Sequence, residues 1–360
     1  MKVEQGLPEA RWWRRLADGR VRCELCPRGC RLRDGQDGFC GSRGNRAGTM
    51  RLVAHGRTSG FAVDPIEKKP LAHFLPGSRV LSFGTVGCNL ACRFCQNWRI
   101  TRARAEALGA EAVSPEWVAA AAGRGRCASV AFTYNDPVVF AEFALEVVAA
   151  CRANGVRTVA VTAGYMCPET RREFFVGMDA ANVDLKAFDD GFYRRQCGAR
   201  LGEVLDTLAF VHRETCAWLE VTTLLIPGLN DSDTEIDRAS DWFAANLGPD
   251  VPWHFSAFHP AGSMLDRDRT PPSTLARARR IAQSKGLHYV YTGNVRDSDG
   301  GRTWCPQCGR CVVDRDGFRL VACLVREGRC TFCGGEIAGV WASAHFRPAD
   351  TDGQPPAADK

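Results

Sequence analysis

Three closely spaced cysteines constrain this chain more than any other feature of its sequence. Cys88, Cys92 and Cys95 have three and then two residues between them, and they directly follow the short apolar run 80–83. The apolar run predicts a strand, so we expect the thiols on a loop that leaves the end of a strand. Cubic iron–sulfur clusters are normally held by four cysteines. Three thiolates on one loop therefore predict a 4Fe–4S cluster with one iron left open, although a structural zinc knuckle or ordinary reduced thiols would use the same residues.

The surroundings of the three cysteines resemble those of the radical S-adenosylmethionine (SAM) enzymes. The similarity includes the flanking sequence G-C-N-L and the aromatic Phe94 before the last cysteine. In that superfamily the open iron binds the amino and carboxylate groups of SAM. The resemblance implies that the reduced cluster splits SAM into methionine and a 5′-deoxyadenosyl radical.

Composition places the chain among globular proteins that hold metals. Its 360 residues are 45% hydrophobic and 24% charged, which suits one large domain with appendages. The 18 cysteines occur largely in CxxC and CxxxC groups, which in cytosolic proteins more often bind metal than form disulfides. No secretory or membrane-spanning apolar run is present, so we expect a cytoplasmic protein. The net charge of +6 is modest and gives no argument for nucleic-acid binding.

A second cysteine group lies near the N-terminus, between glycines and a proline that favour tight turns. Four thiolates can close a tetrahedral zinc site or ligate a second iron–sulfur cluster, and thiolate chemistry suits both. No coordination position would remain open, so we expect a structural or an electron-transfer role. The group consists of Cys23, Cys26, Cys30 and Cys40.

A third group, near the C-terminus, has the pattern of a zinc ribbon: two C-x-x-C-G knuckles joined by a spacer that we expect to be rich in strands. Its predicted ligands are Cys305, Cys308, Cys330 and Cys333. Cys311 and Cys323 leave alternatives open, because either could replace a ligand and Cys311 could join an iron–sulfur site. Residues 346–360 have no apolar face to bury, so we expect them to be disordered.

Between the outer groups, apolar runs alternate with amphipathic ones. This rhythm predicts a parallel sheet with helices outside it, closed or partly open as a barrel, with its active site at the carboxyl ends of the strands. The predicted strands are 80–84, 128–133, 157–162, 180–186, 217–225, 251–257 and 287–292. One predicted helix opens at Ser114-Pro115-Glu116, with Ser114 as N-cap. The other predicted helices are 138–152, 169–176, 201–213, 232–246 and 273–285.

Polar residues recur with period two in three of these strands, which gives each strand one polar face. If these faces turn inward, they line a wide cavity for a polar molecule such as SAM; the alternative is that they face water. The pairs are Asp184 with Lys186, Glu220 with Thr222, and His254 with Ser256.

Two further stretches have both a structural and a functional interpretation. Asp136 precedes a proline and suits a helix N-cap, but it or Asn135 could also meet the ammonium group of SAM. Residues 64–71 contain paired lysines and prolines, which fit either a solvated turn or a loop that closes over the cluster.

At a closer level the chain resembles the radical SAM protein of the AmmeMemoRadiSam system, a relative of the pyruvate formate-lyase activating enzymes. The most specific stretches are G-C-N-L-A-C-R-F-C-Q-N-W, F-T-Y-N-D-P, A-A-N-V-D-L-K-A-F, T-T-L-L-I-P-G-L-N-D and V-P-W-H-F-S-A-F-H-P. The resemblance implies a partial (β/α)6 TIM-type barrel over residues 76–298. A cysteine-rich metal-binding segment (1–75) precedes it, and a zinc-ribbon-like domain (299–345) follows.

The same resemblance implies which residues surround the cofactor. Three positions depart from the family pattern: Asp136 stands where glutamate is usual, Ala163 where asparagine is usual, and Ala257 where a larger basic residue is common. The implied SAM-pocket residues are Phe94, Asn135, Asp136, Thr162, Asp184, Lys186 and His254.

The resulting prediction is a radical enzyme, of an oxidoreductase or transferase type, that abstracts hydrogen from an unidentified substrate. The alternatives are an activase of a glycyl-radical enzyme, a non-catalytic zinc-ribbon adaptor, and methyl transfer by nucleophilic attack on SAM. The reaction needs an electron donor such as a flavodoxin or ferredoxin. The family name also implies association with Memo-type and Ammecr-type proteins.

Overall fold

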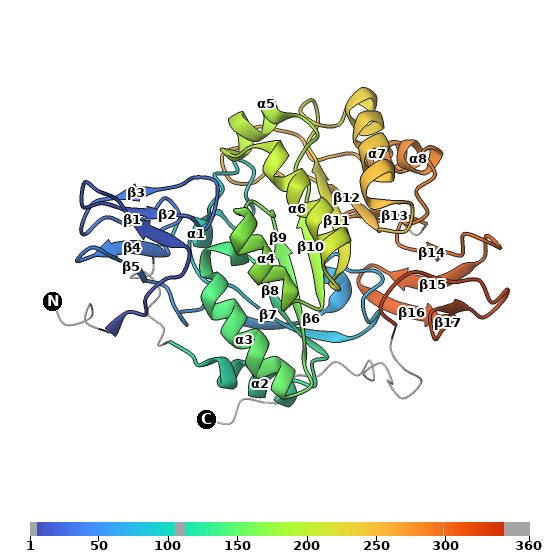
Figure 1. The fold of residues 1–360 in the computed structure, drawn as a ribbon. Coiled ribbons are helices and arrows are strands. Elements are labelled where there is room, and N and C mark those ends of the chain that lie inside the picture. Colours follow the sequence, from blue (N-terminus) through green and yellow to red (C-terminus); the bar gives the residue numbers. More distant parts are fainter. Residues whose placement is uncertain (1–5, 105–111, 298, 342–360) are drawn as a thin grey trace.

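A single sheet of eight strands forms the centre of the molecule (Figure 1). The structure is a computed structural model that describes residues 6–104, 112–297 and 299–341. Strands β7 to β13 are mutually parallel and lie in chain order, and β6 pairs antiparallel with β7 at one edge. The strands are β6 (Phe61–Pro65), β7 (Arg79–Phe83), β8 (Ser129–Phe132), β9 (Arg157–Thr162), β10 (Ala180–Asp184), β11 (Trp218–Leu225), β12 (Trp253–Ala257) and β13 (Val290–Gly293).

Helices fill the crossovers between the parallel strands, as the alternating sequence pattern predicts. They are α1 (Trp98–Thr101), α2 (Pro115–Arg124), α3 (Ala141–Ala153), α4 (Pro168–Val176), α5 (Asp190–Phe192), α6 (Leu201–Glu214), α7 (Asp233–Leu247) and α8 (Pro272–Ser284). A 3-10 turn (Pro137–Phe140) precedes α3, and a π-helical turn (Tyr193–Cys197) follows α5. Local sequence sets the boundaries: the side chain of Ser114 accepts the Trp117 amide at the start of α2, with Pro115 in the first helical position.

The seven predicted strands and six predicted helices are all present, with boundaries shifted by a few residues at most. Within the described residues no ladder joins β6 to β13, so the sheet is open at both edges. The partial (β/α)6 barrel stays a prediction. The predicted domain boundary after residue 75 falls between β6 and β7. These two strands pair with each other, so the central sheet begins earlier in the chain than the predicted barrel segment.

Two smaller modules flank the sheet on opposite sides, the N-terminal one in blue and the C-terminal one in orange and red (Figure 1). Within residues 6–104, 112–297 and 299–341, no helix combines the length and the apolar character that crossing a membrane requires. The tail from residue 346, for which we predict disorder, lies outside the described residues. The N-terminal strands are β1 (Trp13–Arg15), β2 (Val21–Cys23), β3 (Arg31–Leu32), β4 (Arg43–Arg46) and β5 (Thr49–Leu52), and the C-terminal strands are β14 (Thr303–Trp304), β15 (Cys311–Asp316), β16 (Arg319–Cys323), β17 (Val325–Arg326) and β18 (Arg329–Cys330).

The segment between β6 and β7 closes the amino ends of the parallel strands. Pro70 accepts a hydrogen bond from Asn182 Nδ2 at 2.7 Å, and the Ala72 and His73 amides donate to Glu220 at 2.8 and 2.7 Å. Lys69 is only 3% exposed. Neither interpretation of residues 64–71 was right: the turn is largely buried, and it lies at the end of the sheet opposite the three-cysteine loop.

A buried ion pair joins the N-terminal module to α3. Arg43 Nη2 lies 2.6 Å from Glu142 Oε1, and both side chains are at most 5% exposed. Replacing one member of such a pair leaves an uncompensated buried charge, which typically costs about 3–5 kcal/mol. We therefore expect Glu142→Ala to lower the free energy of unfolding by about that amount, as measured by denaturant titration.

Glu146→Ala is the matched control for this prediction. Glu146 lies one turn further along α3, is 48% exposed and pairs with His55 at the surface. We expect it to change the free energy of unfolding by about 0.5 kcal/mol or less. Equal losses in the two variants would contradict the assigned role of the buried pair.

Candidate functional site

The loop that carries Cys88, Cys92 and Cys95 leaves the carboxyl end of β7 and is held from two sides. Asn135 accepts the Thr85 amide at 2.9 Å and donates through Nδ2 to the Gly87 carbonyl at 2.9 Å. On the other side, the Ala91 amide donates to the Cys197 carbonyl at 2.8 Å. These bonds fix the loop before any ligand binds.

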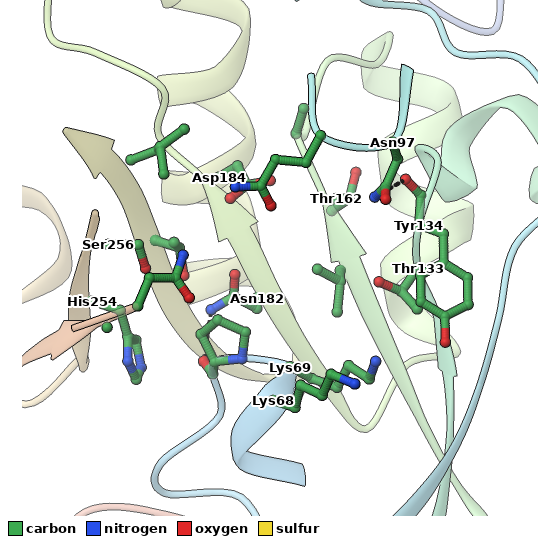
Figure 2. Close-up of a pocket in the computed structure, with 18 of the residues that line it drawn as sticks. Lys68, Lys69, Asn97, Thr133, Tyr134, Thr162, Asn182, Asp184, His254 and Ser256 are labelled. Carbon is green, nitrogen blue, oxygen red and sulfur yellow. Dashed lines mark hydrogen bonds between the residues drawn. The ribbon is translucent and has the colours of Figure 1, made fainter. Parts of the chain in front are cut away.

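The three cysteines lie at the wall of a cavity of about 620 Å³ that is lined by side chains of the parallel strands and of the loops that follow them. Figure 2 shows this space, with Lys68 and Lys69 below Asn182 and with Asn97 at the opposite end. The lining includes all ten residues predicted for the cluster and for SAM: Cys88, Cys92, Phe94, Cys95, Asn135, Asp136, Thr162, Asp184, Lys186 and His254. The polar strand faces thus turn inward as predicted, and the structure brings the predicted residues into one place.

This donor set fits a cluster with three protein ligands. Cys88, Cys92 and Cys95 are the only cysteines among the described residues that line the cavity. Burial raises the pKa of the Cys88 and Cys95 thiols, so metal binding has to displace their protons. When such a cluster is bound, its open iron can take the amino and carboxylate groups of SAM.

Cys197 is a neighbour of this site that the sequence did not reveal. It belongs to no recognisable motif in the sequence. A hydrogen bond with Cys197, together with burial, raises the pKa of Cys92 well above its ordinary value. Cys197 is fully buried and does not line the cavity, so it contacts Cys92 from behind the loop.

Asp136 serves as the N-cap of the 3-10 turn that precedes α3, and not of the long helix itself, for which we predict it; its hydrogen-bonding capacity is largely used. Its side chain accepts hydrogen bonds from Thr162 Oγ1 at 2.8 Å, from the Ala163 amide at 2.9 Å and from the Val138 amide at 3.1 Å. Burial nevertheless raises the pKa of Asp136. The same carboxylate therefore ties the ends of β8 and β9 together.

Asp184 and Lys186 form an ion pair of 2.6 Å that is open to the cavity. Burial opposes the charge of Lys186, but Asp184 and Cys92 keep the pKa of its ammonium above the ordinary value. The pair offers one anionic and one cationic group next to each other.

The amino end of the cavity is closed by a buried carboxylate. Glu220 accepts hydrogen bonds from His254 Nε2 at 2.6 Å, from Trp218 Nε1 at 3.0 Å and from the Ala72 and His73 amides. Burial alone would raise the pKa of Glu220, but the bond from His254 holds it below the ordinary value. His254 is therefore committed to Glu220 on one side while its ring lines the cavity.

A chain of hydrogen bonds connects this closed amino end of the cavity, which we call the cavity floor, to the C-terminal module. Arg315 Nη1 donates to Thr303 Oγ1 at 3.0 Å, Thr303 Oγ1 lies 2.7 Å from Tyr291 Oη, and Tyr291 Oη lies 2.6 Å from His73 Nε2. His73 Nδ1 lies 2.6 Å from the Ala338 carbonyl, so this nitrogen carries a proton, and burial lowers the pKa of the ring and so keeps it neutral.

The C-terminal cysteines converge as the zinc-ribbon pattern predicts. The sulfur atoms of all four lie within 4.8 Å of one another, with Cys305 and Cys333 3.7 Å apart and Cys308 and Cys330 3.8 Å apart. Zinc–thiolate bonds of about 2.3 Å in a tetrahedron place sulfurs about 3.8 Å apart. The group thus has the geometry of a single-ion site. Cys311 lies outside it and contacts the Val313 carbonyl.

The N-terminal cysteines are differently arranged. One small cavity is lined by all four of them, Cys23, Cys26, Cys30 and Cys40. Their sulfur atoms do not converge as the C-terminal ones do: in the described residues, no three of them all lie within 4.8 Å of one another.

Comparisons with known proteins agree on one superfamily. The family model of the Radical SAM superfamily matches residues 83–238. An uncharacterized protein of Methanocaldococcus jannaschii is 38% identical over 331 residues, which cover 91% of this chain and 98% of that protein.

Solved structures are more distant in sequence. Streptococcus suis SuiB bound to precursor peptide SuiA has a TM-score of 0.50 at 13% identity, covering 64% of this chain and 52% of SuiB. A domain of the pyruvate-formate lyase-activating enzyme from Bacteroides vulgatus has a TM-score of 0.41 at 18% identity, covering 46% of this chain and 99% of that domain. The SuiB match indicates a similar fold and no more.

His73 makes the stability of the protein depend on pH. Burial lowers its pKa from 6.5 to about 4, so the folded state resists protonation that the unfolded state accepts. The contribution of neutral His73 to the free energy of unfolding is therefore fully present above about pH 6.5. This contribution falls by about 3 kcal/mol as the pH drops to about 4. We expect denaturant titrations at several pH values to show this loss in the wild type and not in His73→Gln.

His288→Asn is a suitable control, because this histidine lies at the surface beside Asp250. It should retain the wild-type pH dependence. Parallel stability curves for the wild type and His73→Gln would contradict the assignment.

Proposed function

The chain belongs to the radical SAM superfamily, and from this premise we propose that it reductively cleaves SAM at a 4Fe–4S cluster held by Cys88, Cys92 and Cys95. The members of the superfamily are enzymes. When bound, the cluster would supply one electron to SAM and so give the 5′-deoxyadenosyl radical that abstracts hydrogen from a substrate. The observation that carries the proposal is the set of three thiols at the wall of a large cavity that has buried polar groups and no fourth cysteine among the described residues that line it.

The ion pair between Asp184 and Lys186 suits the amino-acid end of SAM. The pair can contact the same two groups that the open iron would bind: the carboxylate accepts a hydrogen bond from Lys186, and the amino group donates one to Asp184, each with one charged partner. Asp136 is less suited to this role, because Thr162 and two backbone amides already occupy its oxygens. We therefore assign the contact with the amino group to Asp184 and a supporting role to Asp136.

The part of the cavity lined by Asn182 and Thr222 is the proposed substrate site. Asn182 Oδ1 and Thr222 Oγ1 are buried and have no hydrogen-bond partner in the described part of the chain, and both residues line the cavity. An unpartnered buried polar atom costs free energy unless a ligand or water satisfies it. The two atoms therefore favour a polar substrate.

The finer assignments of the family resemblance also remain proposals. We infer a partial (β/α)6 barrel, which the consecutive strand order supports, and a zinc ion at the C-terminal cysteines. We infer cytoplasmic location from the free state of all 18 cysteines, which suits a reducing compartment. Membership of the AmmeMemoRadiSam system, with Memo-type and Ammecr-type partners and a flavodoxin or ferredoxin donor, rests on the sequence stretches quoted above.

The alternatives differ in their products. An activase would carry the radical to a glycine of a partner protein, methyl transfer would give S-adenosylhomocysteine, and a non-catalytic adaptor would contain zinc without iron. The cavity favours the radical enzyme over the adaptor, because an adaptor has no need for buried polar groups without partners.

Loss of one loop cysteine should abolish SAM cleavage. We expect anaerobically reconstituted protein to form 5′-deoxyadenosine with reductant and SAM, and Cys92→Ala to form none above background, as measured by chromatography. Cys127→Ala, which removes a buried thiol outside the cavity, should retain wild-type activity. The proposal fails if the wild type is inactive while a known radical SAM enzyme reacts in parallel.

Thr222→Val should separate substrate binding from SAM cleavage. The change is nearly isosteric and removes a hydroxyl without a protein partner, so we expect unchanged or slightly raised stability. The purified variant should still form 5′-deoxyadenosine. In cells, its metabolite profile should nevertheless shift in the same direction as that of a strain with alanine at Cys88, Cys92 and Cys95. A wild-type profile would contradict the placement of the substrate.

A further inference from the structure

We propose that Cys23, Cys26, Cys30 and Cys40 hold a second iron–sulfur cluster, which passes electrons to the cluster at Cys88, Cys92 and Cys95. The electron-relay part rests on the proposed function, whereas the presence of the second cluster does not.

The four N-terminal cysteines come together through the turns of their module. Cys23 ends β2, and its amide donates to the Cys30 carbonyl at 2.9 Å. Cys26 opens the turn that closes with the Gly29 amide, and Cys40 lies shortly before β4. All four line one cavity, whose other walls are largely apolar: Leu25, Leu32, Phe39 and Val139. The lining suits a metal site shielded from water.

The spacing of the sulfurs distinguishes this group from the C-terminal one. A single zinc ion draws four thiolates together, as the C-terminal sulfurs within 4.8 Å of one another illustrate. In a 4Fe–4S cluster each cysteine binds a different iron, so the ligands stand further apart. In the described structure, no three of the N-terminal sulfur atoms all lie within 4.8 Å of one another. Their wider spacing around one cavity therefore favours a cluster over a single ion.

A buried guanidinium faces the same cavity and has unused hydrogen-bond donors. Arg43 is 1% exposed and lines the cavity. Its Nη2 pairs with Glu142, but Nε and Nη1 have no partner in the described structure. Buried donors without partners are costly unless a ligand accepts their hydrogen bonds. A cluster with four thiolate ligands carries net negative charge and would supply sulfur acceptors on this side of the guanidinium.

The position next to the radical site indicates what the second cluster does. Cys40 lines a cavity of about 290 Å³ together with Cys88, Cys92 and Cys95. The backbones also meet: a Cβ on Gly87 would overlap the Cys40 carbonyl oxygen, and Ser42 Oγ donates to the Val86 carbonyl at 2.8 Å. A purely structural zinc needs no such position, whereas an electron carrier must lie close to its acceptor.

The outer side of this module gives a donor access. Phe39, which lines the N-terminal cavity, is 53% exposed, and Cys30 and Cys40 are only partly buried. A one-electron carrier protein of the flavodoxin or ferredoxin class would reduce the N-terminal cluster by one electron. That electron would then reduce the cluster at Cys88, Cys92 and Cys95, and the N-terminal cluster would return to its oxidised state. No bond is made or broken in the transfer.

The test of the second cluster leaves the N-terminal cysteines intact. In the variant Cys88→Ala/Cys92→Ala/Cys95→Ala, reconstituted without oxygen, we expect the iron and sulfide of one cluster, an electron paramagnetic resonance spectrum after reduction, and one zinc per chain. Adding Cys23→Ser and Cys40→Ser should remove the iron, while adding Cys127→Ala should leave it. Protein without iron but with a second zinc would overturn the proposal.

The relay is tested with two reductants in Cys40→Ser, whose radical-site cysteines are all present. We expect 5′-deoxyadenosine formation to fall at least tenfold with reduced flavodoxin and less than twofold with dithionite, which is small enough to reach the radical site directly. Equal activity of variant and wild type with flavodoxin would overturn the relay. Iron in the triple variant without SAM cleavage by the wild type would instead refute the proposed function and leave the second cluster standing.

Discussion

The burial of charged and polar side chains inside a parallel sheet is the constraint on which the rest of this structure depends. Interiors of such sheets are usually apolar, because a buried polar group without a partner costs free energy. Here the main carboxylates are satisfied by dedicated donors or counter-ions. Asp136 receives three hydrogen bonds, Glu220 receives four, and Asp184 pairs with Lys186. Among the described residues that line the cavity, Glu67, Asn182, Thr222 and Arg315 each keep a buried polar atom without a hydrogen-bond partner. Those of Asn182 and Thr222 lie on neighbouring strands, where a ligand could satisfy both.

The same constraint explains why the three-cysteine loop is rigid. Its backbone groups lie at the edge of a polar cavity, where water and ligands compete for hydrogen bonds. Asn135 satisfies the Thr85 amide and the Gly87 carbonyl with one side chain, and the turn ending at Cys197 satisfies the far end of the loop. Because the thiols are presented by a fixed backbone, little conformational entropy is lost when they bind a metal.

Sequence alone predicted the strands and the helices, since each follows from a local period. The cysteine motif and the family resemblance together predicted ten of the residues that line the cavity. The N-cap role of Asp136 is local in the same way. What could not be predicted depends on contacts between distant positions. The segment 66–73 belongs to the cavity floor because Glu220, 148 positions after Ala72, accepts its amides. Cys197 lies beside Cys92 because it ends a π-helical turn, and no sequence pattern predicts that turn. Choosing Cys305, Cys308, Cys330 and Cys333 over Cys311 likewise required the folded ribbon.

The cavity also argues that the three modules work as one unit. The C-terminal module contributes Arg315, Gly317 and Phe318 to its lining, and Arg315 Nη2 binds the Ala72 carbonyl in the floor. At the other end, the N-terminal module abuts the cysteine loop through Cys40 and Ser42. An adaptor would present its ribbon on a flexible tether, free of the sheet. This ribbon is instead joined to the sheet by buried hydrogen bonds through Tyr291 and His73, so its position is coupled to the shape of the cavity that binds the substrate.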